Sequence, residues 1–144
     1  MTATAPDAIA SIVVEQDAKR VWTALTDPAE ICHYFFGTQV ITDWTVGGTI
    51  VFQGEWQGKT YRDHGSILAF DPPHQVTMTH YSPLTGLPDL PENYHTVSYL
   101  LEPAPEGTTV TIRQSGNRSV GEVTESERTW NLVLTNLKNY LAQD

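Results

Sequence analysis

Residues 121–143 read GEVTESERTWNLVLTNLKNYLAQ, and the spacing of their hydrophobic side chains decides the fold. The apolar positions recur every three or four residues, at Val123, Trp130, Val133, Leu134, Leu137 and Leu141. This period places them on one face of an α-helix, with Glu122, Glu125 and Lys138 elsewhere. A helix of about twenty residues is ~30 Å long. Its apolar face therefore predicts that the helix packs on a broad apolar surface, which the preceding part of the chain must form.

The sequence before this helix is mostly strand-like, with β-branched and aromatic runs bounded by turn residues. The strands that we expect cover residues 9–15, 39–44, 49–56, 59–70, 75–81, 94–102 and 108–115. Several of them are joined by short connections, at Gly47-Gly48, Gln57-Gly58 and residues 103–107. Such strands form antiparallel sheets, and a helix then covers the apolar face. The expected fold class is α+β, with a curved antiparallel sheet of about six or seven strands around a long C-terminal helix.

Two short helices are expected after the first strand. Asp17 can cap a helix over residues 18–25, which carries an apolar face. Asp27 is a second cap, and Pro28 suits the first helical position because its missing N–H costs nothing there. This second helix is expected to end near the aromatic residues 34–36 and the glycine that follows them.

One long loop is expected inside the domain. Residues 81–91, YSPLTGLPDLP, contain three prolines and a glycine, which argue against regular structure. A loop of this length in a compact protein is often a lid or a rim. Its leucines, Leu84, Leu87 and Leu90, also make it the best candidate for contact with a partner protein.

Size and charge limit the classes of function. The chain has 144 residues, and we expect an extended or disordered N-terminus over residues 1–8 and a single domain over residues 9–144. The net charge of −9 argues against nucleic acid as a partner, because phosphate backbones are held by clustered cations. No run of about 18 apolar residues occurs, so no membrane span is expected. The single cysteine, Cys32, and the absence of a visible secretion signal favour the cytoplasm.

Several short motifs occur together in a characteristic order. They are residues 18–28 (AKRVWTALTDP), Asp43-Trp44 with Gly47-Gly48, residues 65–68 (GSIL), 71–73 (DPP) and 107–111 (GTTVT), and Trp130. In this order they resemble the SRPBCC superfamily, also called START-like or Bet v 1-like. Within it, they are similar to the branch related to the C-terminal domain of the activator of the Hsp90 ATPase. The resemblance extends from about residue 9 to residue 141.

This resemblance implies a helix-grip fold, in which the sheet wraps around the last helix and leaves an elongated cavity. It does not fix the activity, since a shared fold hosts many functions. Members of the superfamily include lipid and hormone binders, cyclases, hydrolase-like enzymes and co-chaperone domains.

Strand parity indicates which side chains face that cavity, because alternate residues of a strand point the same way. The ligand-binding candidates are Phe36, Phe52, Trp56, Met78, His80, His95, Tyr99, Gln114, Trp130 and Leu134. Among them, His80, His95 and Gln114 end apolar rows and are the expected polar contacts of an otherwise hydrophobic site. Core packing is the alternative for each aromatic residue and for Met78.

We expect no metal, no cofactor and no assigned catalytic residue. The five histidines show neither the i, i+4 helical nor the i, i+2 strand spacing of a ligand set, and no cysteine pair supports them. No Gly-x-Ser-x-Gly elbow or glycine-rich phosphate loop occurs. Asp63 or His80 could act as acid or base if buried in the cavity, whereas the alternative for Asp63 is an ion pair at the surface or across strands.

Three classes of function therefore remain open. The leading hypothesis is a protein that binds a small hydrophobic molecule in its interior. The alternatives are an interaction module with a chaperone partner, as in the Hsp90-activating relatives, and a cyclase or hydrolase acting on an aromatic or polyketide-like substrate. A homodimer is compatible with the sequence but has no specific support in it.

Overall fold

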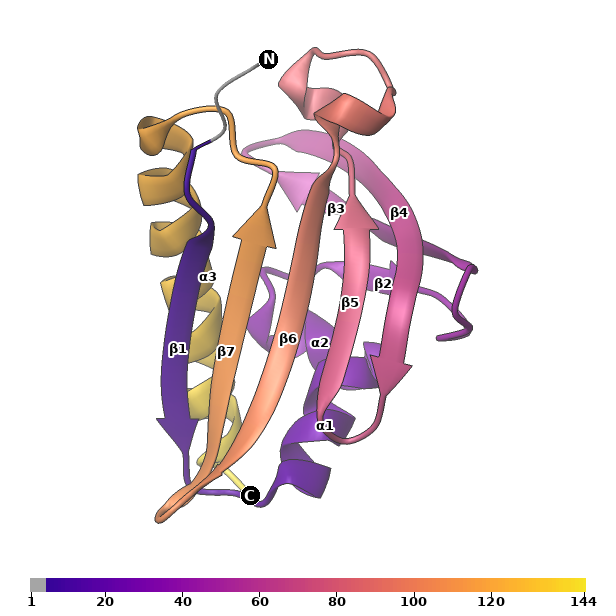
Figure 1. Cartoon of the computed structure of the whole chain (residues 1–144). Helices are drawn as coiled ribbons and strands as arrows, with labels where there is room; N and C mark the ends of the chain where they lie inside the picture. The colour runs from indigo at the N-terminus through magenta and orange to yellow at the C-terminus, as the bar shows by residue number, and fades with distance from the viewer. Residues whose placement is uncertain (1–4) are drawn as a thin grey trace.

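The computed structural model describes residues 5–144 and contains one seven-stranded antiparallel sheet in this part of the chain. The strands follow the spatial order β1-β7-β6-β5-β4-β3-β2 (Figure 1). Their bounds are β1 Ala8–Val14, β2 Gln39–Ile41, β3 Thr49–Trp56, β4 Lys59–Asp71, β5 Gln75–His80, β6 His95–Ala104 and β7 Gly107–Ser115. The predicted α+β fold class is confirmed. Of the expected N-terminal segment, residues 1–4 lie outside the described residues, and residues 5–7 precede β1 without regular structure.

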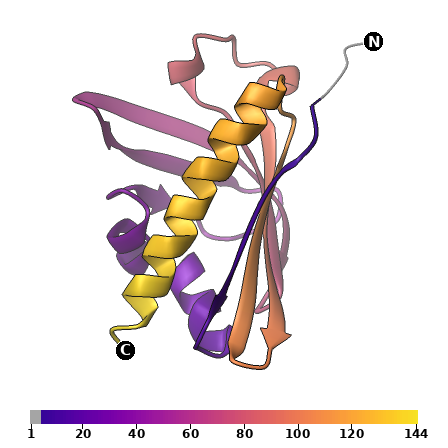
Figure 2. The ribbon, with the colours of Figure 1, turned by 90° about the vertical axis from the view of Figure 1, so that its left-hand side faces the viewer.

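Three α-helices lie on the same side of the sheet (Figures 1 and 2). They are α1 Ala18–Thr26, α2 Pro28–Tyr34 and α3 Val120–Leu141. Asp17 caps α1 by accepting a hydrogen bond from the Arg20 backbone, and Asp27 caps α2 in the same way from Ala29. Both helix starts were predicted from these two residues. Figure 2 shows α3 crossing the sheet obliquely, with the β3–β4 hairpin reaching outward on the side that α3 occupies.

The sheet bends at β4, which is thirteen residues long. Its pairing with β5 shifts register between Ile67 and Ala69, which marks an irregularity of the bulge type. Gly65 lies directly against the Thr79 backbone, so closely that a Cβ atom there would overlap the Thr79 carbonyl. The glycine thus permits a close approach of two strands where the sheet curves toward the helices.

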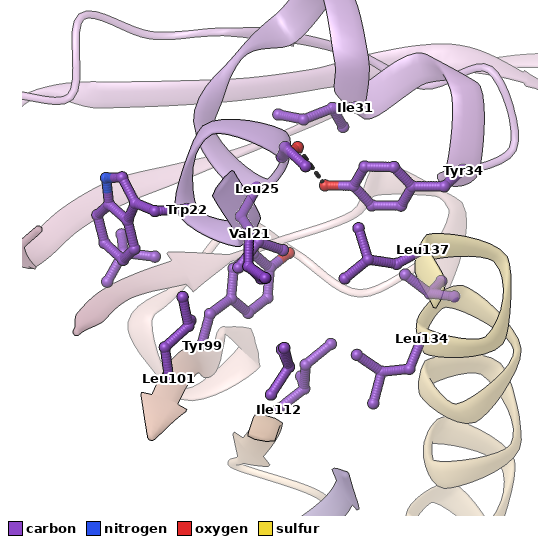
Figure 3. Close-up of a cluster of buried hydrophobic side chains, with 14 of the residues drawn as sticks. Val21, Trp22, Leu25, Ile31, Tyr34, Tyr99, Leu101, Ile112, Leu134 and Leu137 are labelled. Carbon is purple, nitrogen blue, oxygen red and sulfur yellow. Dashed lines mark hydrogen bonds between the residues drawn. The ribbon is translucent and has the colours of Figure 1, made fainter. Parts of the chain in front are cut away.

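The core packs between the sheet and the part of the helical layer formed by α1, α2 and the C-terminal half of α3 (Figure 3). Its members come from every layer and include Val21, Leu25, Ile31, Tyr34, Leu101, Ile112, Leu134 and Leu137. The buried Tyr34 hydroxyl donates a 2.8 Å hydrogen bond to the Ala24 carbonyl, which links α2 to α1 (Figure 3). Burial raises the pKa of Tyr34 well above its usual value, so this hydroxyl stays protonated and remains a donor.

Three local expectations need correction. The strand expected over residues 39–44 ends at Ile41, because Trp44 takes a left-handed backbone (φ 60°) and its indole donates to the Thr26 carbonyl at 2.9 Å. The loop after β5 contains two short 3-10 helices, Pro83–Thr85 and Pro91–Asn93, since proline suits a first helical position. The hairpin loop expected over residues 103–107 shrinks to a two-residue turn, because β6 and β7 pair as far as Ala104 and Gly107.

Candidate functional site

A cavity of about 490 Å³ lies between the sheet, the segment after α2, and α3. Strands β3 to β7 line it from one side, and one face of the N-terminal half of α3 lines it from the other. Three hydrophobic side chains of its lining are about half exposed, Trp56 at 50%, Leu84 at 53% and Leu132 at 50%. The cavity therefore opens to solvent on the side where these three residues lie.

Eight of the ten ligand-binding candidates lie at this cavity: Phe36, Phe52, Trp56, Met78, His80, Tyr99, Gln114 and Trp130. Six of these eight lie on strands, and alternation along the strands brings them to one face because the strands pair without slippage along most of β3, β6 and β7. Their role in binding a ligand stays a prediction, since their position alone does not test it.

His95 and Leu134 lie elsewhere. His95 shares a face with Val97, but it stands at the start of β6, where its Nε2 contacts Glu122 Oε1 at 3.2 Å. Glu122 also accepts a 2.8 Å hydrogen bond from the Arg118 backbone at the start of α3. Burial opposes ionisation of Glu122, but the hydrogen bonds from Arg118 and His95, together with electrostatic attraction to both residues, lower its pKa. His95 therefore helps to anchor the helix start.

Leu134 belongs to the core, with 1% of its surface exposed. It follows Trp130 by one helical turn, and Figure 3 shows it facing Ile112 of the sheet beside Leu137. The apolar face of α3 thus divides along its length. Its first half borders the cavity, and its second half packs into the core.

Gln114 borders the cavity, but its polar atoms are occupied by the protein. Its side-chain nitrogen donates to Asn117 Oδ1 and to Ser126 Oγ, both at 2.9 Å. Its oxygen accepts a 2.9 Å hydrogen bond from Trp130 Nε1. Gln114 therefore fixes the position of Trp130 rather than presenting a free amide to a ligand.

Asp63 and His80 form a polar pair in the cavity wall. His80 Nε2 and Asp63 Oδ2 are 3.0 Å apart, and the Asp63 side chain is only 13% exposed. The Phe52 and His80 rings pack in a T-shaped arrangement, with centroids 5.4 Å apart. Since Asp63 occupies Nε2, the Nδ1 atom is the imidazole nitrogen left for other contacts. The Asp63–His80 contact joins β4 to β5, so Asp63 does form the cross-strand ion pair that was the alternative for it, whereas Arg62 donates a 2.7 Å hydrogen bond to Gln53.

The second carboxylate oxygen of Asp63 has no partner. Oδ1 is buried and accepts no hydrogen bond from any described residue. An unsatisfied buried acceptor costs about 1–3 kcal/mol, and more when it is charged. Asp63 therefore brings to the cavity wall a carboxylate whose only side-chain partner among the described residues is His80, through Oδ2.

Other lining residues were not among the candidates. Thr38 and Tyr61 share a 2.6 Å hydrogen bond between their hydroxyls, and Tyr61 lies on the same face of β4 as Asp63, so strand parity could have found it. Ser126 and Thr129 come from α3. Ser126 follows Val123 by three residues, and a small polar residue inside an apolar stripe was the available signal for a cavity there.

The remaining candidates for reactivity are dispersed. Among residues 5–144, no three His, Cys, Asp or Glu side chains are grouped as metal ligands. Cys32 is half-buried, and its thiol donates to the Ala29 carbonyl in α2. His33 stacks on Tyr140, and His64 pairs with Asp89 at the surface. No helix in the described part of the chain has the length and hydrophobicity to cross a membrane.

Residues 16–142 match the family model described as activator of Hsp90 ATPase homolog 1-like protein. The chain belongs to this family. The resemblance to SRPBCC proteins seen in the sequence is thereby confirmed, and the structure carries the expected sheet and C-terminal helix. A comparison with curated proteins gave no match.

Solved structures include several similar to this member of the activator of Hsp90 ATPase homolog 1-like family. A Cytophaga hutchinsonii protein, known from its solution structure, is 41% identical, with a TM-score of 0.85 over 99% of this chain and 97% of the other. A Mesorhizobium loti protein is 20% identical, with a TM-score of 0.77 over 96% and 98% of the two chains. DynU16, a protein in the dynemicin biosynthetic locus, is 20% identical, with a TM-score of 0.79 over 94% of this chain and 47% of its own. The last two show a shared fold.

Proposed function

We propose that this protein binds a small hydrophobic molecule in the cavity between its sheet and α3. The observation that carries the proposal is the cavity itself, of about 490 Å³ and walled mainly by aromatic and aliphatic side chains. Ligand pockets of proteins have volumes of about 300–1,000 Å³ and the same composition, with a few polar groups to orient the ligand. The Asp63–His80 pair is such a group here.

The expected driving force is burial of apolar surface. A ligand that buries ~200 Å² of apolar area gains ~5 kcal/mol at ~25 cal/mol per Å², before the cost of association. The aromatic wall is partly ordered before binding, because Trp130 is held by Gln114 and packs edge-on against Phe35 at a centroid distance of 5.7 Å. Because these side chains are already held in place, less side-chain conformational entropy is lost when a ligand binds.

The setting of the relatives agrees with a small-molecule role. A protein of the same fold, DynU16, belongs to a biosynthetic locus.

The lone Cys32, half-buried and unpaired with another cysteine, supports a reducing cytoplasmic environment for this protein.

Fluorescence titration with 1-pyrenemethanol tests the proposal. Pyrene accepts excitation energy from tryptophan, and Trp56 and Trp130 both border the cavity. We expect saturable energy transfer in the wild type and at least a ten-fold loss of affinity in Met78→Trp, which fills the cavity. Leu68→Trp is the matched control, since Leu68 is half exposed and lies outside the cavity lining.

Val97→Trp is an independent block of the same cavity, and circular dichroism identifies variants that retain the fold. Absence of saturable binding to the wild type would count against the proposal. Unchanged binding in a folded Met78→Trp or Val97→Trp variant would do the same.

An acid–base enzyme is the second candidate, and the Asp63–His80 pair is the observation that favours it. A carboxylate that holds one imidazole nitrogen orients the other toward a substrate, as a general base requires. Hydrolysis of 1-pyrenemethyl acetate tests the hydrolase form of this candidate. Turnover above the buffer rate that disappears in His80→Ala would support it, and a rate equal to buffer would reject it for esters of this shape.

A further inference from the structure

In the part of the chain that the structure describes, the cavity wall contains acidic side chains without basic ones of the lysine or arginine type to balance them. Asp63 and Glu125 border the cavity, whereas no lysine or arginine side chain does so among residues 5–144. The nearest basic residue along β4, Arg62, alternates to the opposite face and bonds Gln53 there. Glu125 lies near Arg128 at 3.7 Å, but both side chains are about 70% exposed, so solvent screens that pair.

The histidine in the wall does not reverse this balance. His80 binds Asp63 through Nε2 at 3.0 Å. With His80 neutral the pair carries one negative charge, and with His80 protonated the pair is neutral. Neither state offers a net positive charge to an anionic ligand.

The same wall suits a group that donates hydrogen bonds. Asp63 brings a carboxylate to the wall, and the wall is rich in aromatic rings, among them Phe52, Trp56 and Trp130. Ring faces attract cations, and carboxylates attract them further. An anionic head group would instead lose its hydration without gaining a counter-charge.

We propose that the cavity selects aromatic ligands whose polar end is an ammonium or a hydroxyl and discriminates against the corresponding carboxylates, with Asp63 as the specificity determinant. This inference rests on the proposed ligand-binding function and narrows its ligand class. It separates the protein from a carrier of fatty acids or other anionic amphiphiles, for which a cationic side chain in the cavity wall would be needed.

Three probes with one ring system test the inference: 1-pyrenemethylamine, 1-pyrenemethanol and 1-pyrenecarboxylate. Their dissociation constants for the whole chain are measured by energy transfer from tryptophan at pH 7.5 and low salt. We expect the amine to bind at least as tightly as the alcohol, and the carboxylate to bind at least ten-fold more weakly than the amine. In Asp63→Asn the ratio of carboxylate to amine dissociation constants should fall to about three or less. Asp71→Asn, an exposed aspartate of the same strand outside the cavity lining, should leave the ratio unchanged.

The outcomes separate the two proposals. Failure of all three probes to bind the wild type would overturn the ligand-binding function, and the selectivity with it. Binding of all three with equal affinity would leave the binding function standing and overturn the selectivity. A ten-fold preference that survives in folded Asp63→Asn would show that Asp63 is not its determinant. The wild-type panel decides the selectivity even if Asp63→Asn fails to fold.

Discussion

Trp130 Nε1 donates a 2.9 Å hydrogen bond to Gln114 Oε1 and so joins α3 to β7 at the wall of the cavity. Gln114 is held in turn by Asn117 and Ser126. This chain of hydrogen bonds fixes how far the N-terminal half of α3 stands from the sheet. The indole of Trp130 is therefore both a wall of the cavity and a structural contact.

Replacement of Trp130 by phenylalanine tests this contact. The variant keeps an aromatic ring but leaves Gln114 Oε1 without its donor, so we expect a loss of about 1–3 kcal/mol in the free energy of unfolding. Urea denaturation measures it. Trp56→Phe is the matched control, because Trp56 is half exposed, and it should cost no more than about 0.5 kcal/mol. Equal losses in the two variants would contradict the structural role of the Gln114 contact.

His80 and His95, both expected from the sequence to be polar contacts of the cavity, should differ in their effect on ligand binding. His80 borders the cavity, whereas His95 contacts Glu122 at the start of α3. We expect His80→Ala to weaken binding of 1-pyrenemethanol by about three- to ten-fold, and His95→Ala to leave it within about two-fold. His95→Ala should instead lower the free energy of unfolding by about 1 kcal/mol, because Glu122 loses a partner. A binding defect in His95→Ala equal to that of His80→Ala would refute the assignment.

Gly65 should tolerate no side chain. A Cβ at this position would overlap the Thr79 backbone, which cannot move aside as a flexible side chain would. We expect Gly65→Ala to destabilise the fold by about 3 kcal/mol or more, measured by thermal and urea unfolding. Gly121→Ala, in the first turn of α3, where a Cβ would meet only Ser119 Oγ at an ordinary contact distance of 3.7 Å, should be neutral or stabilise by up to about 1 kcal/mol. A mild effect of Gly65→Ala would falsify the close approach of β4 and β5.

Acid should weaken the fold through Glu30. The Arg20 guanidinium lies 2.8 Å from Glu30 Oε1, and the Tyr140 hydroxyl donates to the same oxygen at 2.7 Å. The hydrogen bonds from Arg20 lead the effects that lower the Glu30 pKa. Because the folded-state pKa is lowered, this contribution is complete above the unfolded pKa of about 4.3 and is lost as the pH falls through the folded value.

Comparison of the wild type with Glu30→Gln across pH measures this contribution. At pH 7 we expect the variant to be less stable by about 1 kcal/mol, since the ion pair is only partly shielded from solvent. Between pH 5 and pH 3 the difference should shrink toward zero as the wild type loses its advantage. A difference that stays constant over this range would show that the Glu30 carboxylate is not the group responsible.

Sequence patterns predicted the fold because its main signals are local. The spacing of apolar residues in α3, the caps Asp17 and Asp27, and the glycine turns each act within a few residues. The error at Trp44 arose because a tertiary hydrogen bond to Thr26 stabilises a backbone that no local pattern indicates. For the site, the alternation of side chains along each strand predicted which strand residues border the cavity, but not which of them contact one another.

The contact between Asp63 and His80 was beyond those patterns. Seventeen residues separate the two, and their meeting depends on the pairing of β4 with β5, which shifts register between Ile67 and Ala69. A one-residue difference in this register would turn one side chain to the other face. The engagement of Gln114 by Trp130 likewise depends on the position of α3 over β7, which helix periodicity does not define.

The indole N–H signals of the tryptophans in a ¹H–¹⁵N correlation spectrum test the central claim most directly. Trp56 and Trp130 border the cavity, whereas Trp22 packs on Phe70 away from it. On titration with 1-pyrenemethanol we expect the Trp56 and Trp130 signals to shift and saturate together while the Trp22 signal stays in place. No shift at saturating probe, or a Trp22 shift as large as that of Trp130, would contradict a ligand site between the sheet and α3.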